Sequence, residues 1–164
     1  MPGMTEREKP GLGELLRYLS EMVEQGAENA YRTLPLVYRP RYTPVLRALA
    51  AGAATVTEIT ARSRVTQGAV SQTVDLMVTD GLVERHSLRD GRKSGLRLTP
   101  AGQLLLRRLI PLWASTFAAI DALEQEIGHP LLRVLEDAAQ ALERQDFAVR
   151  LQAVRAERTG GSHV

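Results

Sequence analysis

A predicted β-hairpin near the middle of the chain limits the folds that this sequence can adopt. Residues 82–87 and 95–99 alternate apolar and polar side chains, and a period of two residues favours β-strands. Between them lies a polar loop, residues 88–94, which contains a glycine as hairpin loops commonly do. The rest of the chain shows mainly helical patterns, so the protein is expected to be mainly α with one small β-structure.

Two short helices are expected directly before this hairpin. Thr57 is predicted to cap a helix over residues 57–63, and Thr66 to cap a second helix over residues 67–79. The second helix should end at Gly81, because glycine accepts the left-handed conformation that often follows a helix. Two short helices joined by a tight turn and followed by a hairpin form a winged helix-turn-helix, in which the second helix enters the major groove of DNA.

Amphipathic helical patterns also precede this region. Residues 12–34 carry apolar side chains at the spacing of one helix face. A further helix is expected to begin where Thr43 acts as N-cap and Pro44 occupies the first helical position. Residues 53–56 are a candidate for a very short strand. The winged region is therefore expected to follow a long helix.

Helical patterns continue after the hairpin. Thr99 and Pro100 repeat the cap-and-proline start, and a long helix is expected from there to Ile127. The sequence Gly-His-Pro at residues 128–130 should break it. Helical spacing then resumes, and Asp146 is a candidate for the start of a last helix.

The composition argues against several functional classes. The chain has no cysteine, which excludes a disulfide framework, a thiolate nucleophile and thiol redox sensing. Its three histidines lack zinc-site spacing, so neither a metal nor a cofactor is expected. No catalytic triad, carboxylate pair or phosphate loop is recognisable, so an enzyme is not expected. With no apolar stretch near the ~20 residues of a membrane span and no signal-peptide core, a cytoplasmic protein without membrane contact is expected.

Basic residues are concentrated in the predicted hairpin. The net charge of the whole chain is only +2, which by itself says nothing about partners. Residues 85–97, however, hold five basic residues against one acid, a local charge of +4. Like charges in a short hairpin repel one another unless an anion offsets them. The hairpin is therefore a candidate for DNA contact, and a solvated loop is the alternative.

The second short helix carries candidates for base contact. Its first turns hold small and amide side chains, which suit the major groove: glutamine pairs with adenine, and Ser or Thr bonds phosphates or bases. Val70, Val74 and residues 76–78 are expected to face the core. The candidates are Thr66, Gln67, Gly68, Ser71 and Gln72 for the recognition helix, with Arg62 and Arg64 for the DNA backbone.

Residues 43–102 resemble the DNA-binding core of the MarR family of bacterial transcriptional regulators. Residues 66–74 are similar to the opening of its recognition helix, and residues 80–85 to its helix-to-wing junction. Residues 90–92 and 98–102 resemble its wing signature, Asp-x-Arg followed by Leu-Thr-x-x-Gly. With the flanking helices, the resemblance covers nearly the whole chain.

The sequence departs from the family pattern at the turn between the two short helices. Residues 62–65 read Arg-Ser-Arg-Val, where the family often has an apolar residue and a glycine. The lack of cysteine also rules out the family's peroxide-sensing branch.

The resemblance implies a winged helix-turn-helix flanked by N- and C-terminal dimerisation helices. Five segments are expected: 1–10 as a disordered N-terminus, 11–36 as the N-terminal dimerisation helix, 41–102 as the winged helix-turn-helix DNA-binding region, 103–158 as C-terminal dimerisation helices, and 159–164 as a disordered tail. The expected function is a sequence-specific regulator, a repressor, that binds double-stranded DNA as a homodimer on a pseudo-palindromic operator. The alternative is a winged helix that serves only protein–protein interaction or dimerisation, without DNA binding. In such modules a catalytic domain follows, for which the ~60 helical residues after the wing are too few.

The wing and a ligand pocket complete the expected sites. Gly91 should let the hairpin turn tightly, so that Arg92 reaches a narrow minor groove. The wing candidates are Arg89, Asp90, Arg92 and Lys93, with Asp90 orienting Arg92 and the other two on phosphates. A small phenolic or anionic effector, implied by the resemblance, would release the DNA. Its pocket is expected at Tyr31, Tyr38, Tyr42 and Trp113, and plain core packing is the alternative for each.

Overall fold

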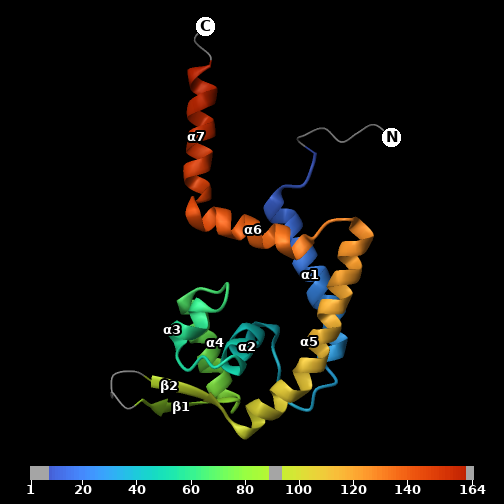
Figure 1. The fold of residues 1–164 in the computed structure, drawn as a ribbon, viewed down its shortest axis with the longest axis vertical. Coiled ribbons are helices and arrows are strands. Elements are labelled where there is room, and N and C mark those ends of the chain that lie inside the picture. The colour runs from blue at the N-terminus through green and yellow to red at the C-terminus, as the bar shows by residue number, and fades with distance from the viewer. Residues whose placement is uncertain (1–7, 89–93, 162–164) are drawn as a thin grey trace. The chain divides into compact units, whose positions relative to one another are not determined.

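The computed structural model describes residues 8–88 and 94–161 of the chain. It is mainly helical with one two-stranded antiparallel sheet, which confirms the predicted fold class (Figure 1). The chain forms two compact units, Met1–Thr116 and Phe117–Val164.

The first unit holds the winged helix-turn-helix. Its elements in chain order are α1 (Leu12–Tyr31), the 3-10 turn η1 (Pro40–Tyr42), α2 (Thr43–Ala50), α3 (Val56–Ala61), α4 (Gln67–Thr79), β1 (Val83–Ser87), β2 (Ser94–Leu98) and the first part of α5 (Pro100–Ile127). Both predicted short helices and both predicted strands are therefore present. Figure 1 shows α2, α3 and α4 gathered next to the two strands.

A contiguous apolar core lies within residues 42–109. It contains Tyr42, Val45, Leu46, Ala48, Ala53, Ile59, Val70, Val74, Met77, Leu82, Val83, Leu96, Leu105 and Leu109. On α4 the inward positions follow i, i+4 and i+7, the spacing of one helix face. The prediction that Leu76 and Val78 also face the core is wrong, because they lie on either side of this stripe and are each 37% exposed.

The two strands pair as the period-two pattern predicted, with Val83 opposite Leu98 and Ser87 opposite Ser94. The candidate strand at residues 53–56 is not one. A single backbone hydrogen bond joins that segment to the sheet, from the N–H of Leu96 to the carbonyl of Ala54, at 2.8 Å.

Two of the predicted helix caps differ from the structure. Thr43 is the first residue of α2 rather than its N-cap, because η1 leads directly into the helix. Thr55, not Thr57, caps α3: its hydroxyl oxygen accepts a hydrogen bond from the N–H of Glu58 at 3.1 Å. The Glu58 carboxylate in turn accepts from the N–H of Ala54 at 2.6 Å, a variant of the capping box.

The junction between α4, β1 and α5 explains the short motifs around it. Gly81 adopts φ 73°, the left-handed conformation that the sequence predicted. Thr99 donates its hydroxyl hydrogen to the carbonyl of Gly81 at 2.5 Å and accepts from the N–H of Gly102 at 3.1 Å. A Cβ on Gly102 would lie 2.0 Å from the carbonyl oxygen of Leu82. The Leu-Thr-x-x-Gly motif therefore fastens α5 to the helix-to-wing junction.

The second unit contains the end of α5, α6 (Leu131–Arg144) and α7 (Phe147–Gly160). Gly128, at φ 72°, ends α5 where the Gly-His-Pro sequence predicted a break. Asp146 caps α7 by accepting a hydrogen bond from the N–H of Val149 at 2.9 Å, as expected. Neither α6 nor α7, both fully described, contains a buried residue.

Candidate nucleic-acid interface

The first half of α4 separates polar from apolar side chains. Four of the five recognition-helix candidates, Thr66, Gln67, Gly68 and Gln72, are exposed, and Ser71 is half-buried. Val70 and Val74 are buried behind them. The structure therefore brings these candidates together on the open side of one helix, and the core holds its other side.

Thr66 is the N-cap of α4, as predicted. Its hydroxyl oxygen accepts a hydrogen bond from the N–H of Ala69 at 3.3 Å. The hydroxyl hydrogen is not used in this bond and can be donated to an anion. The first N–H groups of a helix also favour a phosphate oxygen. A Cβ on Gly68 would meet open space, so no contact within the described chain requires glycine there.

Arg62 and Arg64 are exposed in the turn between α3 and α4. The guanidinium of Arg62 donates to the carbonyl of Ala51 at 2.6 Å and so ties this turn to the end of α2. A guanidinium has five N–H donors, so this bond leaves others for a phosphate. The turn that departs from the family pattern is thus stabilised by one of its own arginines.

Two arginines of the hairpin strands are held by acidic neighbours. Arg85 on β1 forms an ion pair with Asp75 on α4, and Arg97 on β2 pairs with Glu84 at 2.5 Å. They therefore brace the hairpin against α4 and across its strands.

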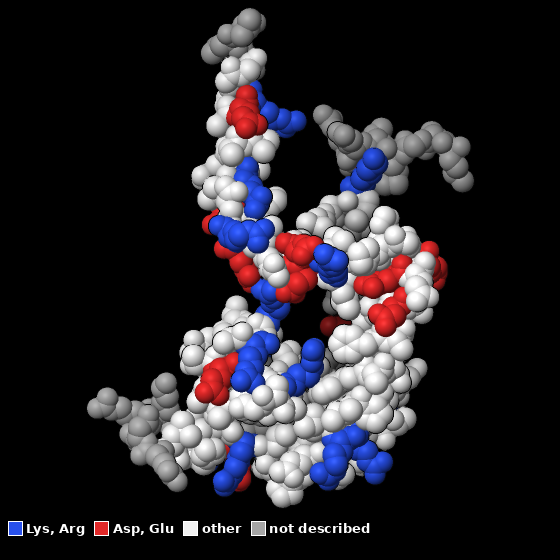
Figure 2. Space-filling model, viewed as in Figure 1, with Lys and Arg blue, Asp and Glu red and all other residues white. Residues whose placement is uncertain are grey.

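The four wing candidates belong to the segment between the two strands. The wing candidates Arg89, Asp90, Arg92 and Lys93 lie outside the described residues. Among the residues drawn in colour in Figure 2, basic side chains form separate groups on the visible face rather than one continuous patch.

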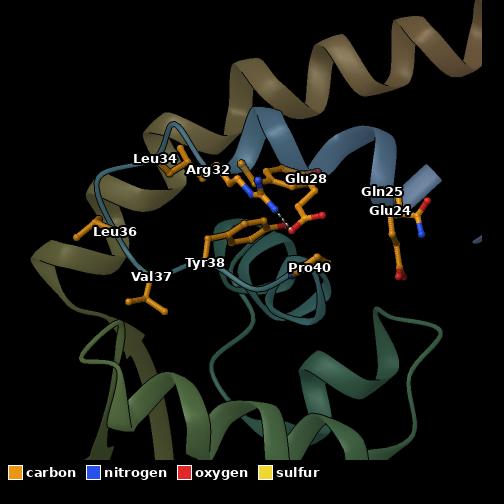
Figure 3. A pocket seen from close by; sticks show the side chains of 10 residues that line it. Glu24, Gln25, Glu28, Arg32, Leu34, Leu36, Val37, Tyr38 and Pro40 are labelled. Carbon is orange, nitrogen blue, oxygen red and sulfur yellow. Dashed lines mark hydrogen bonds and ion pairs between the residues drawn. The ribbon is translucent and has the colours of Figure 1, made fainter. Parts of the chain in front are cut away.

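A cavity of about 550 Å³ lies between the end of α1 and the segment that leads to η1 (Figure 3). Its volume falls within the usual range of small-molecule sites. The lining residues are Glu24, Gln25, Glu28, Tyr31, Arg32, Leu34, Leu36, Val37, Tyr38 and Pro40. Most of them come from sequence positions that carry no binding motif, which is why sequence reasoning missed eight of the ten.

Two of the four expected pocket residues line this cavity. The rings of Tyr31 and Tyr38 lie 4.7 Å apart between centroids and are tilted by 55°. The Tyr38 and Thr43 hydroxyls are hydrogen-bonded, and burial raises the pKa of Tyr38 to about 12. Arg32 pairs with Glu28 at 2.7 Å, as the dashed line in Figure 3 marks.

The other two pocket candidates do not line this cavity. Tyr42 is fully buried in the core, and its hydroxyl donates to a carboxylate oxygen of Asp80 at 2.5 Å. Burial, followed by this hydrogen bond, raises the pKa of Tyr42. Trp113 is half-buried against the core, and its indole lies near the Tyr38 hydroxyl, where it opposes the rise in the pKa of Tyr38 without forming a well-aligned hydrogen bond.

The described ranges, residues 8–88 and 94–161, show neither a metal-binding cluster nor a helix able to span a membrane. No group of three or more His, Asp or Glu side chains there is arranged to hold a metal ion. No helix within these ranges combines the length and apolar character needed to cross a membrane.

The chain is similar to known transcriptional regulators. Residues 39–93 match the sequence model of the MarR family. No curated protein sequence is detectably similar to the chain. Among solved structures, the MosR regulator of M. tuberculosis in complex with DNA matches with a TM-score of 0.68 and 23% identity. That match covers 82% of this chain and 98% of the MosR chain.

Two further structures match at 25% identity and a TM-score of 0.60. One is the PcaV regulator of Streptomyces coelicolor in complex with its natural ligand, covering 85% of this chain and 99% of PcaV. The other is a MarR family regulator of Silicibacter pomeroyi, covering 80% of this chain and 94% of that protein. In the matched segment and in the winged fold, the chain is thus similar to transcriptional regulators of the MarR family.

Proposed function

We propose that the protein regulates transcription by binding double-stranded DNA through α4 and the wing. The observation that carries this proposal is the exposed polar face at the start of α4, backed by the buried Val70 and Val74. The fold shared with MosR, which was solved in complex with DNA, supports it.

Each candidate residue has a role in this proposal. Gln67, Ser71 and Gln72 contact base edges, and Thr66 donates its hydroxyl hydrogen to a phosphate. Gly68 lets the helix approach the groove closely. Arg62 and Arg64 contact the DNA backbone next to α4. In the wing, Arg92 enters the minor groove with Asp90 orienting it, while Arg89 and Lys93 bind flanking phosphates.

We propose that the regulator is a homodimer. All of α1 is described and none of its residues is buried, although it carries the apolar stripe Leu12, Leu15, Leu16, Leu19, Met22 and Val23. On α6 and α7 several large apolar side chains are likewise exposed. A second copy would cover these faces and present two recognition helices. They would read a pseudo-palindrome whose half-sites lie about one turn of DNA apart.

We propose repression as the consequence of binding, because a bound dimer occludes the DNA that it covers. An effector in the cavity at Tyr31 and Tyr38 would release it, and the solved PcaV complex with a natural ligand supports this part of the proposal. Of the two expected ligand classes, the lining favours a phenol over an anion. It holds Glu24 and Glu28, and its one arginine already pairs with Glu28.

An electrophoretic shift assay on DNA upstream of the protein's own gene tests this function. We expect specific binding near 10⁻⁸ M, roughly 10³-fold tighter than to a scrambled duplex. Equal affinity for both duplexes would contradict sequence-specific regulation. Binding to neither would favour the protein–protein interaction module instead.

A further inference from the structure

Two neighbouring residues hold α4 from behind. Arg41 in η1 donates from Nε to the hydroxyl oxygen of Thr73 at 3.2 Å, in the middle of α4. Tyr42, the next residue, donates to Asp80 at 2.5 Å, at the C-cap of the same helix. One short segment is therefore hydrogen-bonded to the recognition helix at its middle and at its end.

Both hydrogen bonds involve buried hydroxyl groups, so breaking either of them is costly. Thr73 is 4% exposed and Tyr42 is 0% exposed, so a displaced hydroxyl would be left without water in the core. The bond to Asp80 has a charged acceptor and is of the stronger kind. Arg39 adds a cation 4.0 Å from the same carboxylate oxygen. Because Thr73 and Asp80 lie on the same helix and its C-cap, α4 cannot shift against this segment without lengthening one of the two bonds.

The same segment forms one wall of the cavity. Tyr38 and Pro40 line it, and Arg41 and Tyr42 follow immediately in the chain. Only three residues lie between Tyr38 and Tyr42, and one of them, Pro40, has a fixed φ, which stiffens the connection. A displacement of the Tyr38 ring would therefore be transmitted through a short, stiff stretch of chain to the buried side of α4.

We propose that residues 38–42 are a mechanical link that couples the cavity to the recognition helix. The link rests on the proposed binding of DNA through α4. A ligand that displaces Tyr38 pulls Arg41 and Tyr42, and with them Thr73 and Asp80, so that α4 leaves its DNA-binding position. Arg41 and Tyr42 are then positioning residues, which act on DNA through the helix that they hold.

The reciprocity of coupling gives a test that needs no ligand. If the conformation of the cavity wall controls the position of α4, then holding α4 in place on DNA must also reduce the motion of the cavity wall. We would measure hydrogen–deuterium exchange of the amides in residues 36–42, free and with saturating DNA. The probe is a duplex selected by the full-length protein from a random pool. We expect DNA to slow exchange there by roughly fivefold or more.

Two variants cut the link while leaving the exposed face of α4 unchanged. Tyr42→Phe removes the bond to Asp80 and keeps the ring in the core; Thr73→Val removes the acceptor for Arg41 and keeps the side-chain volume. In each, at saturating DNA, we expect most of the slowing to disappear. Tyr18→Phe, which removes a hydroxyl from an exposed position of α1, is the matched control and should retain it.

The outcomes separate the link from the proposed function. Slowing that persists in both variants would mean that DNA shields these amides directly, and would overturn the link. Wild-type protein that binds DNA with unchanged exchange at residues 36–42 would also overturn it. Failure to select any duplex would instead contradict DNA binding itself, and the link would fall with it.

Discussion

The winged region and the helices α1, α6 and α7 use their apolar residues in opposite ways. Within residues 42–109, apolar side chains from four helices and two strands meet in one core. The three other helices carry apolar stripes of the same kind, and none of their residues is buried. The same helical pattern therefore completes a core in one region and leaves apolar surface in the other.

Amphipathic periodicity alone therefore does not say what covers a helix. A stripe is buried within the chain only where other elements return to it, as β1, β2 and α5 return to α4. Large exposed apolar surface in a folded chain marks a contact with another molecule. Substitutions that alter one of the two regions and leave the other unchanged should therefore have different effects.

The largest effect is expected from a charge in the middle of the α1 stripe. Leu19 is 44% exposed in the single chain, and in the proposed dimer it lies in the interface. Leu19→Glu would bury an unpaired carboxylate in each copy, at a cost of about 3–5 kcal/mol in dimer stability. Light scattering at micromolar concentration should then show a species of about 18 kDa, the monomer mass.

Ser20→Glu is the control for this prediction. It adds the same charge one position along α1, at an exposed residue off the stripe, and should leave the dimer intact. Wild-type protein that is itself a clean monomer would show that the apolar faces serve some purpose other than self-association.

The next largest effect is expected from a substitution that disturbs the packing of the core. A Cβ at Gly102 would lie 2.0 Å from the backbone oxygen of Leu82, which cannot rotate away as a side chain can. Gly102→Ala should therefore lower the free energy of unfolding by roughly 2–3 kcal/mol, even after the gain in helix propensity. Urea unfolding followed by circular dichroism measures the change.

Gly68→Ala provides the opposite case within the same region. Its Cβ would meet open space on the exposed side of α4, so helix propensity should raise stability by about 0.5–1 kcal/mol. If the two alanine variants were equally stable, the close packing of α5 against the helix-to-wing junction would be disproved.

Sequence reasoning succeeded where one residue decides a boundary. Thr66, Gly81 and Asp146 end or begin helices by local chemistry, and each lies where the sequence predicted it. The prediction that Thr57 caps α3 was wrong, because Thr55 is the N-cap. Thr55 has a glutamate three residues later, as a capping box requires. The sequence contained that capping box, so this error was avoidable.

Neither the cavity nor the contacts of residues 38–42 with α4 could be predicted from local sequence patterns. Tyr42 and Asp80 are 38 residues apart, and nothing in the local pattern of either residue indicates the other. Tyr42 was expected in a ligand pocket, whereas packing places it in the core and leaves Tyr38 at the cavity. Contacts of this range are decided by tertiary packing, which a single sequence does not encode position by position.

A third prediction concerns exposed surface that is polar rather than apolar. Gln72 is exposed on α4, so Gln72→Ala should leave both unfolding and dimer formation unchanged. It should weaken binding to the selected operator by roughly 1–3 kcal/mol and binding to random DNA very little. Fluorescence anisotropy with both duplexes measures the difference. Equal losses on the two would assign Gln72 to the DNA backbone rather than to a base.

A small effect is expected at Tyr38, where α1 meets the winged region. The pKa of Tyr38 is raised from 10.0 to about 12, mainly because burial disfavours the phenolate. Below pH 10 the phenol is neutral in both the folded and the unfolded chain, and its contribution to stability is fully present. As the pH rises from 10 to 12 the unfolded chain loses this proton first, so that contribution is lost. Because Tyr38 is only partly buried, solvent screening limits the loss to about 1 kcal/mol.

Tyr38→Phe removes the titrating group and should flatten this part of the pH profile. Urea unfolding between pH 9 and pH 12 measures the slope for the wild type and the variant. Tyr18→Phe, at an exposed position on the same helix as Tyr31, should keep the wild-type slope. A wild-type slope retained by Tyr38→Phe would mean that the ring is open to solvent. The end of α1 would then be loosely held against the winged region, and the contrast between the two regions would extend to residue 38.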